Sequence, residues 1–267
     1  MPPQMPNFGR PPRPTWRLTV VGARDVTPRM REVSFIGDDL AAFSFRPGQD
    51  LLLNIPIDGG AARRHYTIRR FDRAELKLDI QFVLHGDAPA ARWARTVQHG
   101  ETLTAEGPRG RTSIHGEADW RLFTGDETAL PGIAAMIESL PAGERAYAIV
   151  EVAGPEEEQP IETAATLDLR WLHRSGHPAA PSWPLINTLA DFELPAGDGQ
   201  ACVIGETATV RAQRQGLIAR GLDKSQIAAE GYWRPGRVGG HDHVNESDMV
   251  LGAAFGRGRR ERGRQFG

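Results

Sequence analysis

Cysteine is almost absent from this chain of 267 residues, because Cys202 is the only one. One thiol forms no intramolecular disulfide, and it cannot supply the four thiolates that hold an iron–sulfur cluster. Cys202 stands between Ala201 and Val203, so we expect it to be a buried residue of a strand. The sequence therefore excludes a disulfide framework and a four-thiolate cluster.

Long apolar runs and a strong net charge are absent as well. No segment has the roughly 18 consecutive apolar residues of a membrane-spanning helix, and residues 1–14 are polar and rich in proline. The formal net charge of −2 gives no overall attraction to nucleic acid or to anionic membranes. We expect a cytoplasmic protein without a nucleic-acid partner and without membrane insertion.

Turn-forming residues, by contrast, are plentiful. The chain has 30 glycines and 20 prolines, which is well below the share of roughly 25–30% that marks disordered chains of low complexity. Hydrophobic residues make up 40% and charged residues 25%, as in ordinary globular proteins. At this length the sequence predicts an ordered protein of two domains, rich in loops.

Short strand patterns bounded by glycine and proline dominate the first half of the chain. They cover residues 17–21, 30–36, 50–55, 64–69, 75–84 and 102–106. In the clearest of them, alternation places five apolar residues on one face: Leu76, Leu78, Ile80, Phe82 and Leu84. One helix is predicted over residues 89–96. Because closure removes free edges, the pattern predicts a six-stranded antiparallel barrel.

Strand and helix patterns alternate from residue 119 onward. Strands are predicted over residues 120–124, 145–151, 167–173, 200–205 and 226–233, and helices over residues 128–140, 183–192 and 207–220. This alternation is typical of a parallel sheet covered by helices, whose ligands bind beyond the carboxyl ends of the strands. The chain lacks Gly-x-Gly-x-x-Gly, so it does not carry the ordinary Rossmann fingerprint.

An Arg-x-Tyr-Thr motif, formed by Arg64, Tyr66 and Thr67, lies on the predicted strand 64–69. Because side chains alternate along a strand, Arg64 and Tyr66 share one face and Thr67 lies on the other. A guanidinium can pair with a diphosphate, and a phenol ring can stack on a flat heterocycle. The motif suits a flavin, although an ordinary surface strand explains it when it is taken alone.

Further motifs occur in a fixed order around this strand. They are Pro47-Gly48-Gln49, His85-Gly86, Ala90-Ala91-Arg92-Trp93-Ala94, Gly107-Pro108-Arg109-Gly110, residues 125–131, Gly205-Glu206 and residues 231–236. In this order and spacing, over residues 15–237, the chain resembles the siderophore-interacting proteins. These are FAD-dependent ferric-siderophore reductases related to ferredoxin–NADP reductases.

The resemblance implies an FAD site in the barrel, with the diphosphate at the start of the helix 89–96. The implied FAD-binding residues are Arg64, Tyr66, Thr67, Arg69, His85, Gly86, Ala90 and Trp93. The family usually has Gly-Pro-Ala before the tryptophan, whereas this chain has Ala88-Pro89-Ala90. Packing in the core also explains Trp93, and a structural role also explains His85.

The resemblance further implies that the parallel sheet binds NADPH or NADH as the electron donor. The implied nucleotide-binding residues are Gly125, Asp126, Thr128, Gly205 and Glu206. Asp126 and Glu127 are equally explained as capping residues of the next helix, and Glu206 either approaches the nicotinamide or caps the helix 207–220. Because carboxylates repel a pyrophosphate, we expect a transient nucleotide site.

The implied reaction passes electrons from NAD(P)H through FAD to a ferric siderophore, so that Fe(II) is released. Arg234 and Arg237 are the implied substrate-binding residues, and Leu52 stands near the position where some members have a lysine. No side chain is expected to act as an acid or a base, and no metal site is expected. Two alternatives remain: a general NAD(P)H–flavin reductase, and a flavin-loaded siderophore-binding protein without turnover.

Four segments follow from these patterns. Residues 1–14 form an extended, proline-rich arm, residues 15–116 the FAD-binding barrel, and residues 117–237 the NAD(P)H-binding-like α/β domain. Residues 238–267 form a basic tail that is expected to be flexible. The protein is expected to be a monomer.

Overall fold

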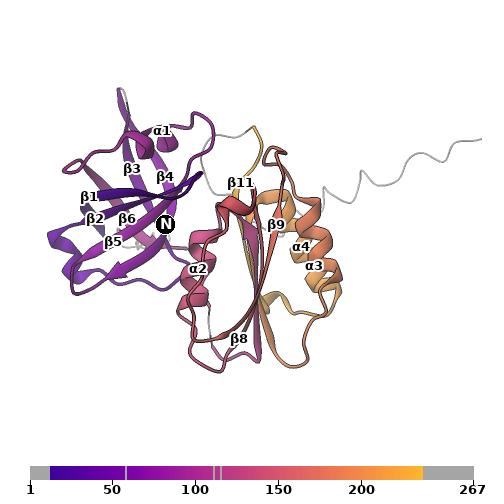
Figure 1. Cartoon of the computed structure of the whole chain (residues 1–267). Coiled ribbons are helices and arrows are strands. Elements are labelled where there is room, and N and C mark those ends of the chain that lie inside the picture. Colours follow the sequence, from indigo (N-terminus) through magenta and orange to yellow (C-terminus); the bar gives the residue numbers. More distant parts are fainter. Residues whose placement is uncertain (1–12, 58, 111, 115, 237–267) are drawn as a thin grey trace, which may run out of the picture.

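The computed structural model describes residues 13–57, 59–110, 112–114 and 116–236. Six strands close into an antiparallel barrel in the order β1-β2-β5-β4-β3-β6, and five strands form a second sheet in the order β11-β10-β7-β8-β9. The pairs of the second sheet are parallel. Figure 1 shows the two halves next to each other. The predicted fold class, a barrel followed by a parallel α/β half, is confirmed.

The barrel contains all six predicted strands. They are β1 (Thr15–Thr27), β2 (Met30–Ile36), β3 (Asp50–Ile57), β4 (Gly60–Asp72), β5 (Lys77–Val83) and β6 (Thr102–Arg109), with a 3-10 turn over Asp38–Ala42. Alternate residues point inward, and Leu18, Phe35 and Ile68 are fully buried. The helix α1 (Pro89–Thr96) has the predicted bounds and packs on this core through Ala90, Trp93 and Ala94.

The strand β5 departs from the predicted pattern in two ways. It begins at Lys77 rather than at residue 75, because Leu76 has a φ of 47° that no strand residue adopts. Its second face is also buried, since the Ser34 hydroxyl donates to Asp79 at 2.6 Å and Gln81 is itself 5% exposed. One-sided alternation is therefore an incomplete description of this strand.

The α/β half contains the five predicted strands and three predicted helices. The strands are β7 (Trp120–Asp126), β8 (Arg145–Val152), β9 (Thr166–His173), β10 (Gly199–Glu206) and β11 (Ile227–Trp233), and the helices are α2 (Leu130–Glu138), α3 (Trp183–Asp191) and α4 (Thr207–Ala219). Short 3-10 turns cover Pro155–Glu157 and Lys224–Gln226. The helix predicted over residues 128–140 is shorter, because Asp126 holds the Thr128 amide in a turn at 2.9 Å.

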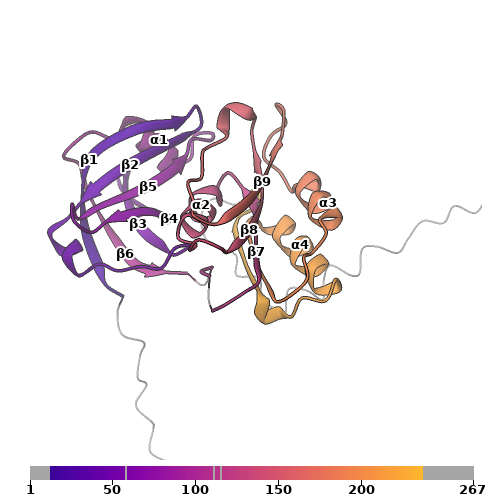
Figure 2. The ribbon, with the colours of Figure 1, turned by 60° about the horizontal axis from the view of Figure 1, so that its bottom comes forward.

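The helix α2 lies between the barrel and the parallel sheet, whereas α3 and α4 cover the opposite face of the sheet (Figures 1 and 2). Every α2 residue from Leu130 to Ile137 is buried. A helix that is apolar all round must be covered on every side, and here β4 covers one side and β7, β8 and β10 the other. Packing on α2 therefore positions the two halves.

Polar contacts reinforce this arrangement at a second place. Glu157, in the loop after β8, is 5% exposed and accepts hydrogen bonds from the Thr27 hydroxyl at 2.5 Å and the Arg29 amide at 3.2 Å. Thr27 is the last residue of β1, and Arg29 lies in the turn between β1 and β2. The barrel is therefore fixed to the α/β half both at α2 and at this turn.

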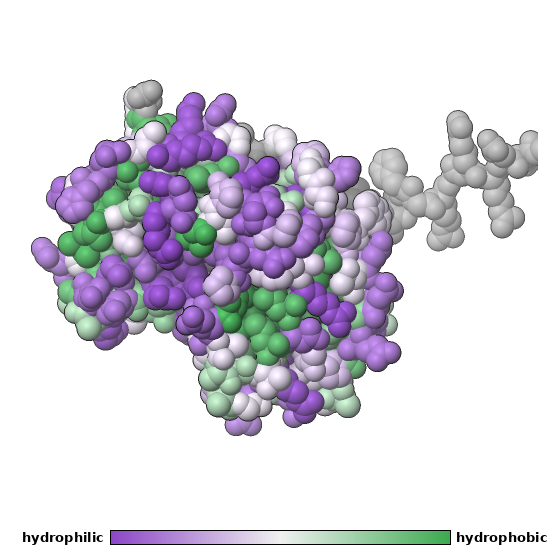
Figure 3. Space-filling view, viewed as in Figure 1, coloured by the Kyte–Doolittle hydropathy of each residue, from purple (hydrophilic) through white to green (hydrophobic). Residues whose placement is uncertain are grey.

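The surface is mostly polar. Figure 3 shows hydrophilic residues over much of one face, with a hydrophobic area on the lower part of the α/β half. Within the ranges that the structure describes, no helix is both long and apolar enough to span a bilayer.

The predicted boundary at residues 116 and 117 lies between β6, which ends at Arg109, and β7, which begins at Trp120. The boundary itself stays a prediction. Residues 1–12 of the predicted arm and the whole predicted tail 238–267 lie outside the described residues.

Candidate functional site

The strand β4 carries the Arg-x-Tyr-Thr motif. Tyr66 packs against the barrel core, with its ring centre 4.2 Å from that of Phe82. Arg64 is partly exposed, and its Nη1 donates to the Arg63 carbonyl at 2.8 Å. Burial raises the pKa of the Tyr66 phenol, and the Arg64 guanidinium lowers it by a smaller amount. The phenol is therefore a neutral hydrogen-bonding group with a cation nearby.

The other face of β4 contacts the α/β half. The Thr67 hydroxyl lies 3.3 Å from the Tyr232 hydroxyl of β11, and a Cβ at Gly132 of α2 would lie 3.0 Å from the Thr67 methyl. Two residues further, Arg69 makes a two-pronged ion pair with Glu138 of α2, at 2.7 and 2.6 Å. Thr67 thus stands at the seam between the halves. The guanidinium of Arg69 is engaged in the same seam, and its contact with a phosphate stays a prediction.

The start of α1 offers backbone amides near β4. Its N-cap is Ala88, which gives no side-chain cap, and Pro89 follows in the first turn. Arg95 donates to the carbonyls of Gly86 at 3.0 Å and Leu84 at 3.1 Å, which ties the preceding loop to the helix. The uncapped amides are therefore available to an anion.

His85, Gly86, Ala90 and Trp93 have different surroundings, although they are close in sequence. His85 and Gly86 are exposed in the loop, and Ala90 is 3% exposed. Trp93 lies in the barrel core, stacked 6.4 Å from Phe35, and its indole N–H donates to Glu101 at 3.2 Å. The structure shows Trp93 packed in the core, and its contact with FAD stays a prediction.

Asp126 joins the carboxyl ends of three strands of the α/β half. It ends β7, and its Oδ2 accepts from the Glu206 amide at 2.9 Å and from the Trp233 indole N–H at 2.8 Å. Its Oδ1 accepts from the Thr128 hydroxyl at 2.5 Å and from the Thr128 amide. Gly205 has a φ of 131°, and a Cβ there would lie 2.6 Å from Oδ2. The predicted residues around this carboxylate are thus brought together.

Burial raises the pKa of the Asp126 carboxyl from 3.8 to about 6, and Glu127 adds to the shift. Between about pH 4 and 6 the folded protein therefore holds a proton that the unfolded chain has lost, so this group's contribution to stability falls as pH rises. Relative to Asp126→Asn, the wild-type free energy of unfolding should fall by up to about 1.4 kcal/mol per pH unit across this window. Above about pH 7 the difference should be constant.

Urea unfolding at about pH 5, 6 and 7.5 measures this difference. Asp168→Asn, at a carboxylate of β9 that is 49% exposed, is the control and should show no such trend. If the free energy of unfolding of the wild type instead rises with pH relative to that of Asp126→Asn, the four hydrogen bonds to Asp126 outweigh the cost of burying its charge.

The remaining carboxylates at this edge are also satisfied within the protein. Glu127 makes a two-pronged ion pair with Arg174, at 2.5 and 2.6 Å, and Arg174 lies 3.5 Å from Glu151. The Glu206 side chain accepts from the Ala208 amide at 3.0 Å and from the Thr209 amide at 2.8 Å. The structure shows Glu206 as the cap of α4, and its approach to the nicotinamide stays a prediction.

The residues predicted to bind the substrate are only partly described. Arg234 follows β11 directly and is exposed, whereas Arg237 lies outside the described residues. Leu52 is 8% exposed and pairs with His65 of β4. Arg234 lies within the described ranges, two residues beyond Tyr232, whose hydroxyl contacts Thr67 at the seam.

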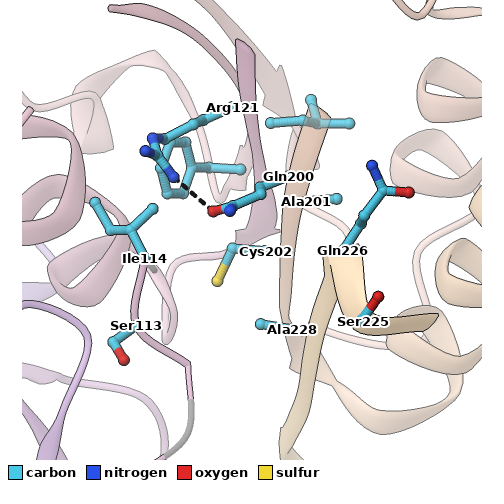
Figure 4. A pocket seen from close by; sticks show the side chains of 11 residues that line it. Ser113, Ile114, Arg121, Gln200, Ala201, Cys202, Ser225, Gln226 and Ala228 are labelled. Atoms are coloured by element: carbon cyan, nitrogen blue, oxygen red, sulfur yellow. Dashed lines mark hydrogen bonds between the residues drawn. The ribbon is translucent and has the colours of Figure 1, made fainter. Parts of the chain in front are cut away.

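A small cavity opens at the other end of the parallel sheet. It has a volume of about 70 Å³ and is lined by residues of the amino-terminal halves of the strands, among them Phe123, Cys202 and Ala228 (Figure 4). Burial raises the pKa of the Cys202 thiol, which disfavours the nucleophilic thiolate. This cavity is too small for a dinucleotide and lies away from the carboxyl ends that parallel sheets use for ligands.

Comparisons with known proteins decide the family. Residues 118–236 match the description "Siderophore-interacting protein", and residues 52–112 match "Siderophore-interacting FAD-binding domain". The ferric vibriobactin reductase ViuB of Vibrio cholerae is 30% identical over 82% of this chain and 89% of that protein. The chain belongs to the siderophore-interacting protein family.

Solved structures of siderophore-interacting proteins have the same architecture. A siderophore utilization protein from T. fusca is 34% identical, with a TM-score of 0.78 over 85% of this chain and 95% of that one. The siderophore-interacting protein SipS from Aeromonas hydrophila is 30% identical, with a TM-score of 0.74 over 90% of this chain and 96% of that one. Both likenesses cover the barrel and the parallel sheet together.

FAD is the cofactor that the matched barrel domain indicates, and the residues of this siderophore-interacting protein fit it. The uncapped start of α1 and the guanidinium of Arg64 are donors for a diphosphate. Tyr66 and Thr67 add a neutral phenol and a hydroxyl on the same strand. Gly86, with a φ of 52° and no atom within 4 Å of an added Cβ, leaves the loop before α1 open.

Sequence reasoning missed several residues of this site in the siderophore-interacting protein. Tyr232 contacts Thr67, Arg174 neutralises Glu127, and Glu138 binds Arg69. The aromatic pair at the end of β11 is a signal for the first, because aromatic residues at a strand end mark a contact or a ligand. No local pattern identifies the other two, since each ion pair joins residues far apart in the chain.

Proposed function

We propose that the protein is a ferric-siderophore reductase that uses NAD(P)H as its electron donor. Bound FAD would accept a hydride from the nucleotide and release its two electrons singly, so that one hydride reduces two ferric ions to Fe(II). The siderophore holds Fe(II) more weakly than Fe(III), and the iron is released. No side chain is required as an acid or a base.

The observation that carries this proposal is a short chain of contacts across the seam. Thr67 of the flavin motif contacts Tyr232, and the next residue, Trp233, donates to Asp126 at the carboxyl edge of the parallel sheet. The strand that carries the flavin motif and the edge where nucleotides bind in such sheets are therefore separated by two side chains. This arrangement supports direct hydride transfer between the two halves.

The charge of the α/β half supports a weakly held nucleotide. Residues 117–236 contain 18 Asp and Glu against nine Lys and Arg. At the edge itself, Asp126 is buried and Glu127 is paired with Arg174, so these two carboxylates repel a pyrophosphate less than free carboxylates would. The pairing provides no net positive charge that would attract the pyrophosphate. A donor that leaves after giving up its hydride needs no tight site.

A ferric siderophore as the acceptor follows from the family and from the relative that is named a ferric vibriobactin reductase. Ferric siderophores are often anionic, and the exposed Arg234 lies one residue beyond Trp233 at the seam. An exposed cation at this point can attract such a chelate toward the flavin.

Anaerobic stopped-flow mixing of the reduced holoprotein with several ferric chelates tests the proposal. Flavin reoxidation that saturates with a ferric siderophore, and that differs between chelates, supports a siderophore reductase. Equal rates with every chelate would instead indicate a general flavin reductase. No flavin reduction by NADH or NADPH would leave a flavin-loaded binding protein as the better description.

We expect Arg234→Ala to raise KM for an anionic ferric siderophore about three- to tenfold, which is the usual effect of one exposed charge contact. The increase should shrink at high salt, because the contact is screened. FAD content and the reduction of a neutral acceptor should be unchanged.

Arg145→Ala is the matched control, since Arg145 is exposed at the amino end of β8. An equal loss with neutral and anionic acceptors would contradict a substrate role for Arg234.

A further inference from the structure

One aromatic side chain is left in water at the edge where the nucleotide is proposed to bind. Trp183 is 70% exposed, whereas the other large exposed hydrophobic residues of the described chain, Ile36 and Ile57, are 40% and 38% exposed. Trp183 is the first residue of α3, which follows the carboxyl end of β9. An indole that is exposed to solvent does not contribute the stabilisation that burial of its apolar surface would give.

The backbone beside Trp183 is held firmly in place. Ser182 is 6% exposed, accepts the Leu185 amide at 3.1 Å as the cap of α3, and donates to Glu151 at the end of β8. The Ser182 amide also donates to the Thr209 hydroxyl at 2.8 Å. Pro184 restricts Trp183 further, since a residue before proline loses backbone freedom. The exposed ring of Trp183 is thus attached to a backbone that the hydrogen bonds of Ser182 hold in place.

A hydrogen bond and two ion pairs connect Ser182 to the edge of the sheet where the nucleotide is proposed to bind. Glu151 lies 3.5 Å from Arg174, and Arg174 is paired with Glu127, the neighbour of Asp126. Ser182 therefore lies over the end of β8, three strands from β11 in the sheet order. At a strand spacing of about 4.8 Å the ends of β8 and β11 lie roughly 14 Å apart in the sheet, a span that an extended dinucleotide covers.

We propose that Trp183 is the stacking platform for the purine base of the nicotinamide dinucleotide. The inference rests on the proposed function, because it takes NAD(P)H as the donor. The nicotinamide would lie at the seam near Thr67 and Tyr232, and the adenine would lie on the indole of Trp183. Stacking on an aromatic ring needs no positive charge, so it provides affinity at an edge where carboxylates dominate.

Two measurements test the platform with the holoprotein. In the first, calorimetry measures the binding of ADP-ribose, which has the adenine but no nicotinamide, to the oxidised protein. In Trp183→Ala its Kd should rise about five- to thirtyfold, the usual effect of losing one base–aromatic stack, and Trp183→Phe should restore most of the affinity. Ile36→Ala, an exposed site on the barrel, should have no effect.

In the second measurement, flavin reduction is followed with NADH, NADPH and the reduced nicotinamide mononucleotide. Trp183→Ala should raise KM for both dinucleotides by the same factor and leave the rate with the mononucleotide unchanged, because that donor has no adenine. Equal losses with all three donors, or no binding of ADP-ribose to the wild type, would overturn the proposal. Binding of ADP-ribose that depends on Trp183, without reduction by any donor, would support the platform and refute the electron donor of the proposed function.

Discussion

Replacing Arg64 by alanine is expected to yield a folded protein that purifies with little FAD. The Arg64 guanidinium is partly exposed, and its Nη1 donates to the Arg63 carbonyl at 2.8 Å. The start of α1, which has no side-chain cap, belongs to a helix that contacts the same strand β4. A charge-assisted contact with the diphosphate is worth about 1.5–3 kcal/mol, which corresponds to an increase of roughly 10- to 150-fold in the Kd for FAD. Titration of the apoprotein with FAD measures this change.

The neighbouring arginine is the matched control for this experiment. Arg63 has a side chain that is 56% exposed and pairs with Glu106 at 2.7 Å. Because alternation sends it to the other face of β4, Arg63→Ala should leave the affinity for FAD unchanged. Stoichiometric FAD in Arg64→Ala, with the wild-type Kd, would show that Arg64 does not bind the diphosphate.

Gly48→Ala is expected to be the most destabilising small substitution at the seam. Gly48 has a φ of 92°, and an added Cβ would lie 1.9 Å from the Thr112 carbonyl oxygen and 2.9 Å from the Met136 sulfur of α2. The left-handed backbone costs about 1–2 kcal/mol and the overlap about 1–3 kcal/mol, so the free energy of unfolding should fall by about 2–5 kcal/mol. Urea unfolding followed by far-UV circular dichroism measures the loss.

Gly59 separates the two contributions. Its φ is 81°, but no atom lies within 4 Å of an added Cβ. Gly59→Ala should therefore show the backbone cost of about 1–2 kcal/mol alone. Equal losses at Gly48 and Gly59 would mean that the turn at Gly48 moves away from Thr112 without cost, and that the seam is looser than its contacts indicate.

The sequence predicted the elements far better than the contacts between them. Local periodicity and turn residues were sufficient for α1, whose bounds match, and for the existence of every barrel strand, although β5 begins two residues later than predicted. The prediction was less accurate where a local hydrogen bond competes with the helix. Asp126 accepts a hydrogen bond from the Thr128 amide, so α2 begins at Leu130 and not at residue 128. Propensity cannot foresee such a competition, because it depends on which side chain reaches which amide.

The candidate site shows the same limit more strongly. Alternation along β4 indicates that Thr67 and Arg69 share a face, but it gives no partner for either. Their partners, Tyr232 and Glu138, are 165 and 69 residues away. Only the fold reveals that Trp93 packs in the core and that Glu206 caps α4, since a core residue and a helix cap have the same local sequence as a ligand contact.

The position of α2 has a consequence for how this chain can be divided. By sequence α2 belongs to the α/β half, yet all its residues from Leu130 to Ile137 are covered, partly by β4 of the barrel. A fragment cut near residue 116 would expose that apolar side, which favours self-association in place of independent folding. We therefore expect the two halves to unfold together, and we expect neither half to fold when it is separated from the other.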